Sequence, residues 1–178
     1  DGTSVFTTHI KDAMWHFDVL RFQMVASQEK EWTDRTPPGF FNQHRGTKSS
    51  PYYDYPYSDI SNNGWSWEYK IMLANETGRD LMLSIPPLAT GRTISDTSSY
   101  IVNLANLIRY GSDGVNPYTS EQASPAYPPL NSNLRVYLEL GNELWNTSGV
   151  FNNNYSNIRL LTEDVIAEDG EDADAITY

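Results

Sequence analysis

The apolar residues of the chain form alternating helix-like and strand-like segments. Segments whose apolar residues recur every three or four positions, as on one face of a helix, are 5–15, 65–78, 101–108 and 158–165. Short apolar runs typical of strands lie between them, at 18–24, 80–90 and 135–143. The predicted order is α-β-α-β-α-β-α. Such alternation indicates a parallel sheet with crossover helices, either an open doubly wound sheet or part of a (β/α) barrel.

Local signals mark the ends of two of these helices. Gly78 and Gly111 stand where the second and third helices should stop, because glycine tolerates the left-handed backbone of a helix end. Asp96 or Thr97 is the expected N-cap of the third helix.

The third predicted strand separates charged from apolar side chains. With a period of two, Tyr137 and Glu139 share one face, while Leu138 and Leu140 share the other. A charge inside a barrel is costly unless it is paired. Arg21 on the first predicted strand is the expected partner of Glu139, because alternate strands of a barrel contribute to one layer. An open sheet has no such interior, so the pattern favours a barrel.

A long segment without clear periodicity, 25–64, follows the first predicted strand and is expected to form a loop over the barrel mouth. The aromatic residues in and just after it include four candidate sugar-binding rings: Trp32, Tyr55, Trp65 and Trp67. Exposed rings would stack on the faces of sugars, but a self-packed lid without a ligand explains the same residues equally well. Both interpretations stay open.

Charge and composition narrow the classes of partner. Twelve basic and twenty-three acidic residues give a formal net charge of −11, which argues against nucleic acid and anionic membranes. No apolar run approaches the roughly 20 residues of a membrane helix, so we expect a soluble protein. The chain has no cysteine, and its three histidines show no metal-ligand spacing. We therefore expect neither a metal nor a cofactor.

The end of the third predicted strand carries the densest set of candidate functional residues. The stretch LELGNELWN places Glu139, Asn142, Glu143 and Trp145 at a carboxyl strand end, where functional groups gather in both candidate folds. The E-x-x-N-E pattern resembles the fourth strand of clan A glycoside hydrolases, the cellulase-like TIM barrels. Arg21 of VLRF resembles their second-strand arginine. The resemblance covers most of the chain and is closest to cellulase-like proteins of largely uncharacterised function.

This resemblance implies a retaining glycosidase that acts on a polysaccharide and favours a secreted or extracellular protein. Glu143 would be the general acid/base, Asn142 would contact the sugar 2-hydroxyl, and Arg21 would support the catalytic carboxylates. Trp145 would bind substrate and shield Glu143 from solvent. A non-catalytic carbohydrate-binding domain or an inactive barrel relative remains the alternative, and an open-sheet protein unrelated to sugars is a third.

The chain departs from the cellulase-like pattern in two places. In the cellulase-like family the third barrel strand commonly ends near a histidine, but the corresponding place in this chain is Pro86-Pro87. The nucleophile of the family's seventh strand is not found in this chain. Because eight strands need about 250 residues, 1–178 are expected to be the amino-terminal portion of one partial (β/α)8 barrel, about strands 2 to 4. The remainder of the barrel would lie beyond Tyr178.

Glu139 is a poor candidate for the second catalytic carboxylate. Retaining enzymes hold their two carboxylates about 5 to 5.5 Å apart. Glu139 lies four residues before Glu143 on an extended strand, roughly 13 Å away at about 3.3 Å per residue. We therefore predict a structural role for Glu139 and a chemical one for Glu143.

Overall fold

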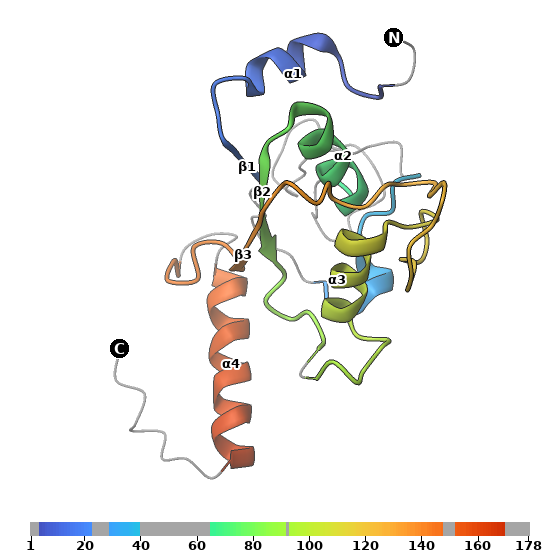
Figure 1. The fold of residues 1–178 in the computed structure, drawn as a ribbon. Helices are drawn as coiled ribbons and strands as arrows, with labels where there is room; N and C mark the ends of the chain where they lie inside the picture. The colour runs from blue at the N-terminus through green and yellow to red at the C-terminus, as the bar shows by residue number, and fades with distance from the viewer. Residues whose placement is uncertain (1–3, 23–28, 40–64, 92, 148–151, 170–178) are drawn as a thin grey trace.

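The computed structural model describes residues 4–22, 29–39, 65–91, 93–147 and 152–169. Its elements in chain order are α1 (Thr8–Met14), β1 (Val19–Phe22), the short 3-10 helix η1 (Trp32–Asp34), α2 (Trp67–Thr77), β2 (Asp80–Ile85), α3 (Tyr100–Tyr110), β3 (Val136–Leu140) and α4 (Asn152–Asp169). Figure 1 shows their arrangement. The predicted alternation of helices and strands is confirmed.

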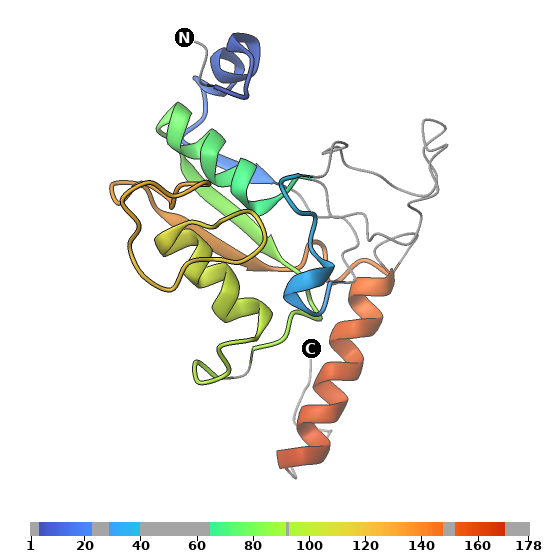
Figure 2. The same ribbon diagram turned by 90° about the vertical axis from the view of Figure 1, so that its right-hand side faces the viewer.

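The three strands form one parallel sheet in the order β1-β2-β3. Leu81 of β2 lies between Leu20 of β1 and Val136 of β3 in the register. Figures 1 and 2 show α2 and α3 on the same side of this sheet. The prediction of an α/β fold with a parallel sheet is therefore confirmed, and the described strands form an open three-stranded sheet.

Side-chain caps and glycines set the helix ends. Ser66 caps α2 and Ser99 caps α3, each accepting a hydrogen bond from a backbone N–H of the first turn. Gly78 ends α2 with a φ of 65°. The predicted cap of α3 at Asp96 or Thr97 is wrong, because Asp96 instead accepts two hydrogen bonds from Ser98 in the preceding turn.

The hydrophobic core lies between the sheet and the two helices that cover it. Leu81 and Leu83 of β2 are fully buried, as are Ile71 of α2 and Leu107 of α3. Ile71 is one of the predicted apolar positions of its helix, whereas Leu107 lies within the predicted third helix but is not one of its predicted periodic positions. Together these side chains fix the spacing of β2 from its covering helices. The opposite face of the sheet carries the polar side chains.

The described part of the segment after β1, residues 29–39, packs against the helices. Arg35 forms a buried salt bridge of 3.0 Å with Glu68 of α2 and donates hydrogen bonds to the carbonyls of Gly114 and Val115. Residues 29–39 are thus built into the core on the side of α2. The rest of the predicted mouth loop lies outside the described residues.

The apolar face of β3 is not covered as the sequence predicted. Leu138 and Leu140 are 63% and 53% exposed. α4 follows β3 in the chain, as predicted, but runs away from the sheet (Figures 1 and 2). None of the described helices, α4 included, is long and apolar enough to cross a membrane.

Candidate functional site

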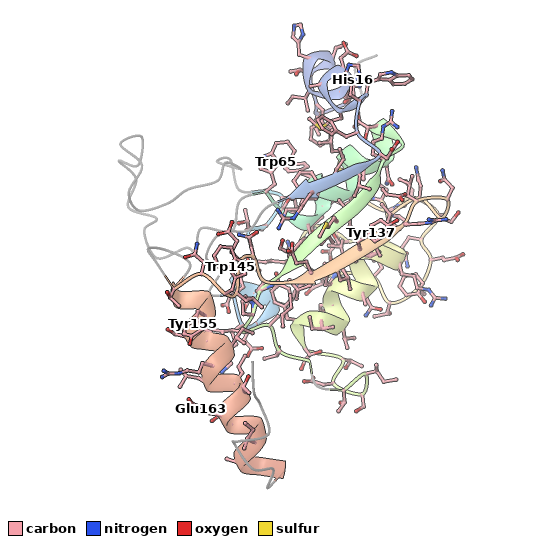
Figure 3. All side chains as sticks on the ribbon, turned by 90° about the vertical axis from the view of Figure 1, so that its left-hand side faces the viewer. His16, Trp65, Tyr137, Trp145, Tyr155 and Glu163 are labelled. Carbon is pink, nitrogen blue, oxygen red and sulfur yellow. The ribbon has the colours of Figure 1, made fainter. Side chains whose placement is uncertain are left out.

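The candidate site lies on the helix-free face of the sheet, near the carboxyl ends of the strands. Figure 3 views this face, with Tyr137 on β3 and Trp145 just beyond the strand ends. The strand register brings polar side chains from all three strands onto it: Arg21 from β1, Ser84 from β2 and Glu139 from β3. Residues distant in sequence therefore meet on one surface.

Arg21 and Glu139 form the predicted ion pair across β2. The Nη2 of Arg21 donates to both carboxylate oxygens of Glu139, at 2.8 and 3.1 Å, and its Nε donates at 3.2 Å. Ser84 lies between them and donates its hydroxyl to Glu139 at 3.1 Å. The two charged side chains are 40% and 31% exposed, so water screens much of their attraction. Their main effect is to fix each other's orientation.

Asn142 joins this cluster from the turn after β3. Its side-chain oxygen Oδ1 accepts a hydrogen bond of 2.8 Å from Nη2 of Arg21, and the residue is only 1% exposed. A buried amide held at its oxygen has a fixed orientation, because the donating nitrogen must then point the other way. Arg21 therefore positions both Glu139 and Asn142.

A tight turn places Glu143 immediately after this cluster. Gly141 donates its N–H to the carbonyl of Ile85 at 2.7 Å and has a φ of 61°. A Cβ at Gly141 would lie 2.6 Å from Cδ2 of Leu144, which would have to move, and the positive φ itself favours glycine at this position. Glu143 itself has a φ of 51°, which is rare for a residue with a side chain.

The Glu143 carboxylate is partly buried and is oriented by its own turn. Asn146 donates its backbone N–H to the carbonyl of Glu143 at 2.9 Å and its side-chain N–H to Oε2 at 3.0 Å. Trp145 is 76% exposed, so its ring gives Glu143 little of the predicted shielding from solvent. The exposed ring is instead free to contact a ligand.

The other predicted sugar-binding rings divide into three groups. Trp32 and Trp67 are 7% and 3% exposed and donate their indole N–H groups within the core, so both are structural, contrary to the prediction. Trp65 is partly buried and stacks on Phe6, with ring centroids 5.8 Å apart. Tyr55 lies outside the described residues. Trp145 alone of the predicted rings in the described part of the chain is largely exposed.

Sequence reasoning missed two members of the site. The sequence places Ser84 in the apolar, strand-like run 80–90, and its position beside Glu139 follows only from the pairing of β2 with β3. Asn146 lies three residues after Glu143, a spacing at which a turn brings the two side chains together. That spacing was visible in the sequence.

The site combines a partly buried carboxylate, an amide of fixed orientation and an exposed aromatic ring. Such a set can bind a hydroxylated ligand and can exchange a proton with it. In the part of the chain that the structure describes, no group of three or more histidine, cysteine or acidic side chains is suited to hold a metal ion. Comparisons with family models, with curated proteins and with solved structures found no match for this chain.

Proposed function

We propose that this chain is part of a retaining glycoside hydrolase-like (β/α)8 barrel that acts on a polysaccharide. The observation that carries the proposal is the double contact of Arg21, which holds Glu139 and Asn142 directly before Glu143. The contact between Arg21 of β1 and Glu139 of β3 joins alternate parallel strands, as in the interior layer of a barrel. The turn after β3 then places Glu143 at the carboxyl end of that strand, where barrel enzymes have their catalytic residues.

Each member of the site then has a distinct role. Glu143 protonates the glycosidic oxygen and later removes a proton from water. Asn142 is buried, so in this proposal it fixes the turn before Glu143 through its contact with Arg21, while Trp145 stacks on a sugar ring. Glu139, already engaged by Arg21 and Ser84, is structural. The nucleophilic carboxylate belongs, in this proposal, to a later strand of a longer protein beyond Tyr178.

The test uses the full-length protein and the substitution Glu143→Gln, which keeps the shape of the side chain and removes its proton. Hydrolysis of polysaccharide, measured as released reducing sugar, should fall by about 10²- to 10⁴-fold, while glycan binding stays nearly intact. Aryl glycosides with activated leaving groups should still react in the first step, because they need no protonation. Glu163→Gln on the exposed face of α4 is the matched control. Near-normal turnover of the Glu143→Gln enzyme on polysaccharide would falsify the assignment.

A carbohydrate-binding domain without catalysis is the second candidate, and the exposure of Trp145 favours it. An exposed stacking ring is sufficient to hold a glycan without cleaving it. In that case the full-length protein releases no reducing sugar, Glu143→Gln leaves binding unchanged, and Trp145→Ala abolishes it.

A further inference from the structure

A cleft of about 480 Å³ lies before the amino ends of β1 and β2, whereas the candidate site lies near the carboxyl ends of the strands. It is formed where α1 and the turn after it meet the end of α2, and its lining residues are Lys11, Asp12, Trp15, His16, Glu76, Thr77 and Arg79. In Figure 3, His16 lies at the top of the view, beyond one end of the strands, and Trp145 lies beyond their other end. The volume falls within the range of about 300 to 1,000 Å³ that is typical of ligand sites.

Contacts between α1 and α2 hold the cleft in shape. Lys11 of α1 pairs with Glu76 of α2 at 3.3 Å, which joins the two helices. Arg79 donates a hydrogen bond of 3.0 Å to the carbonyl of Trp15, and its guanidinium carbon lies 5.3 Å from the centroid of the Trp15 ring. The indole is therefore oriented before any ligand arrives, which reduces the entropy lost on binding.

The Trp15 ring is both fixed and accessible. Trp15 is 73% exposed although Arg79 contacts its ring, so most of the indole surface remains open to solvent. An indole fixed at the edge of a polar cleft offers an apolar surface beside hydrogen-bonding groups. A ligand that suits it has one apolar face and polar groups around its rim.

The charges of the cleft favour a neutral ligand. Lys11 and Arg79 balance Asp12 and Glu76, and Asp18 adds a negative charge 3.9 Å from Arg79. An anion would compete with Glu76 for Lys11 and with Asp18 for Arg79, and a cation would compete with Lys11 for Glu76. Donors and acceptors of both kinds remain available around the ring, which is what the hydroxyl groups of a sugar require.

We propose that this cleft binds a neutral oligosaccharide, with one pyranose ring stacked on Trp15. It would be a second glycan-binding site on the chain, separate from Glu143, that holds a polysaccharide without cleaving it. The choice of ligand class agrees with the proposed function, but the cleft's own geometry and charge carry the inference.

The five tryptophan indole N–H signals of the 178-residue chain provide a direct readout by NMR. The probes are β-1,4-linked hexasaccharides of glucose, mannose and xylose, with a galacturonate hexamer and inorganic phosphate as anionic probes. At least one neutral hexasaccharide should shift the Trp15 signal saturably, and the anionic probes should not. Trp15→Ala should weaken this binding about fivefold to tenfold, since it removes the stacking surface. Trp15→Phe should lose less.

Phe17→Ala is the matched control, because Phe17 is also an exposed ring on the same segment but does not line the cleft. It should leave the affinity unchanged. No shift at Trp15 with any neutral probe, or a shift with phosphate or galacturonate alone, overturns the inference. A shift at Trp145 alone overturns it and leaves the proposed function standing. A shift at Trp15 in a full-length protein that lacks hydrolysis supports this site and contradicts the proposed function.

Discussion

Glu143 combines the candidate chemistry with an unfavourable backbone. Its φ of 51° makes it the only non-glycine residue with positive φ in the described part of the chain. A left-handed conformation costs an L-residue about 1 to 2 kcal/mol, because Cβ approaches the following carbonyl oxygen. Backbone strain of this kind clusters at functional sites. The outlier therefore adds a physical reason to place function at Glu143.

We expect Glu143→Gly to raise the free energy of unfolding by about 1 kcal/mol, because glycine adopts this φ without strain. Glu143→Gln should give no such gain, since it keeps both the Cβ and a side-chain oxygen that accepts from Asn146. Urea denaturation of the two variants and the parent chain measures the difference. Equal stability of the glycine and glutamine variants would contradict the interpretation of strain at this residue.

At the residue scale, side-chain contacts could be predicted only where strand parity alone decides them. Arg21 and Glu139 were paired correctly because both lie on polar faces of alternate strands. Ser84 could not be placed, since its contact depends on the register of β2 with β3. The exposure of side chains could not be predicted from the sequence either. Trp32 and Trp145 are the same residue type, yet Trp32 is buried and Trp145 is exposed.

The amino-terminal ends of α2 and α3 enclose a cluster of buried ionisable groups. Glu29 accepts a hydrogen bond from Tyr100, the first residue of α3, and is 1% exposed. Burial raises the pKa of Glu29 to about 7, against the lowering effects of Tyr100 and Lys70. Burial likewise lowers the pKa of Lys70 on α2 to about 8, although Glu29 and Glu68 raise it. The Nζ of Lys70 lies 3.8 Å from the Trp67 ring centroid.

These shifts predict a minimum of stability between about pH 7 and 8. The folded state holds the Glu29 proton more tightly than the unfolded chain does, so stability falls as the pH rises from about 4.5 to 7. Lys70 loses its proton more easily when folded, so stability rises again from about pH 8 to 10.5. Thermal unfolding across this range measures the effect. Glu29→Gln should reduce the loss of stability between about pH 4.5 and 7, and part of it should remain because burial also raises the pKa of Glu68. A loss as large as that of the parent chain would refute the assignment.

At the element scale, the spacing of apolar residues and the residues typical of turns were sufficient to predict most helix and strand boundaries. Apolar spacing predicted α2 and its end at Gly78, because a helix that packs on a sheet needs one continuous apolar face. The cap of α3 was misplaced by two or three residues, since Asp96, Thr97 and Ser99 are all suitable caps and only the turn geometry chooses Ser99. The buried pairing of Arg35 with Glu68 had no signal in the sequence, because their separation follows no period.

At the scale of the whole molecule, alternation of helices and strands predicted a parallel sheet, and that sheet is present. Alternation cannot decide whether a sheet closes, because closure depends on strands that pair at both edges. Here β1 and β3 are the edges of the described sheet. The apolar side chains of β3 that a closed or doubly covered sheet would bury remain open to water.

That open face makes self-association of the 178-residue chain the expected behaviour in solution. Leu138 and Leu140 lie side by side on the uncovered face of an edge strand, and such edges pair with other chains. Leu138→Lys should shift sedimentation velocity profiles toward the monomer by removing apolar surface at the edge. The substitution also changes the formal net charge from −11 to −10, because it adds one lysine. Reduced repulsion alone would favour association, so a shift toward monomer must come from the lost apolar contact.

Leu160→Lys, at a 52% exposed leucine on α4, changes the charge equally and should associate like the parent chain. A parent chain that stays monomeric at every concentration, or a Leu160→Lys variant that dissociates as fully as Leu138→Lys, would show that β3 is not the contact.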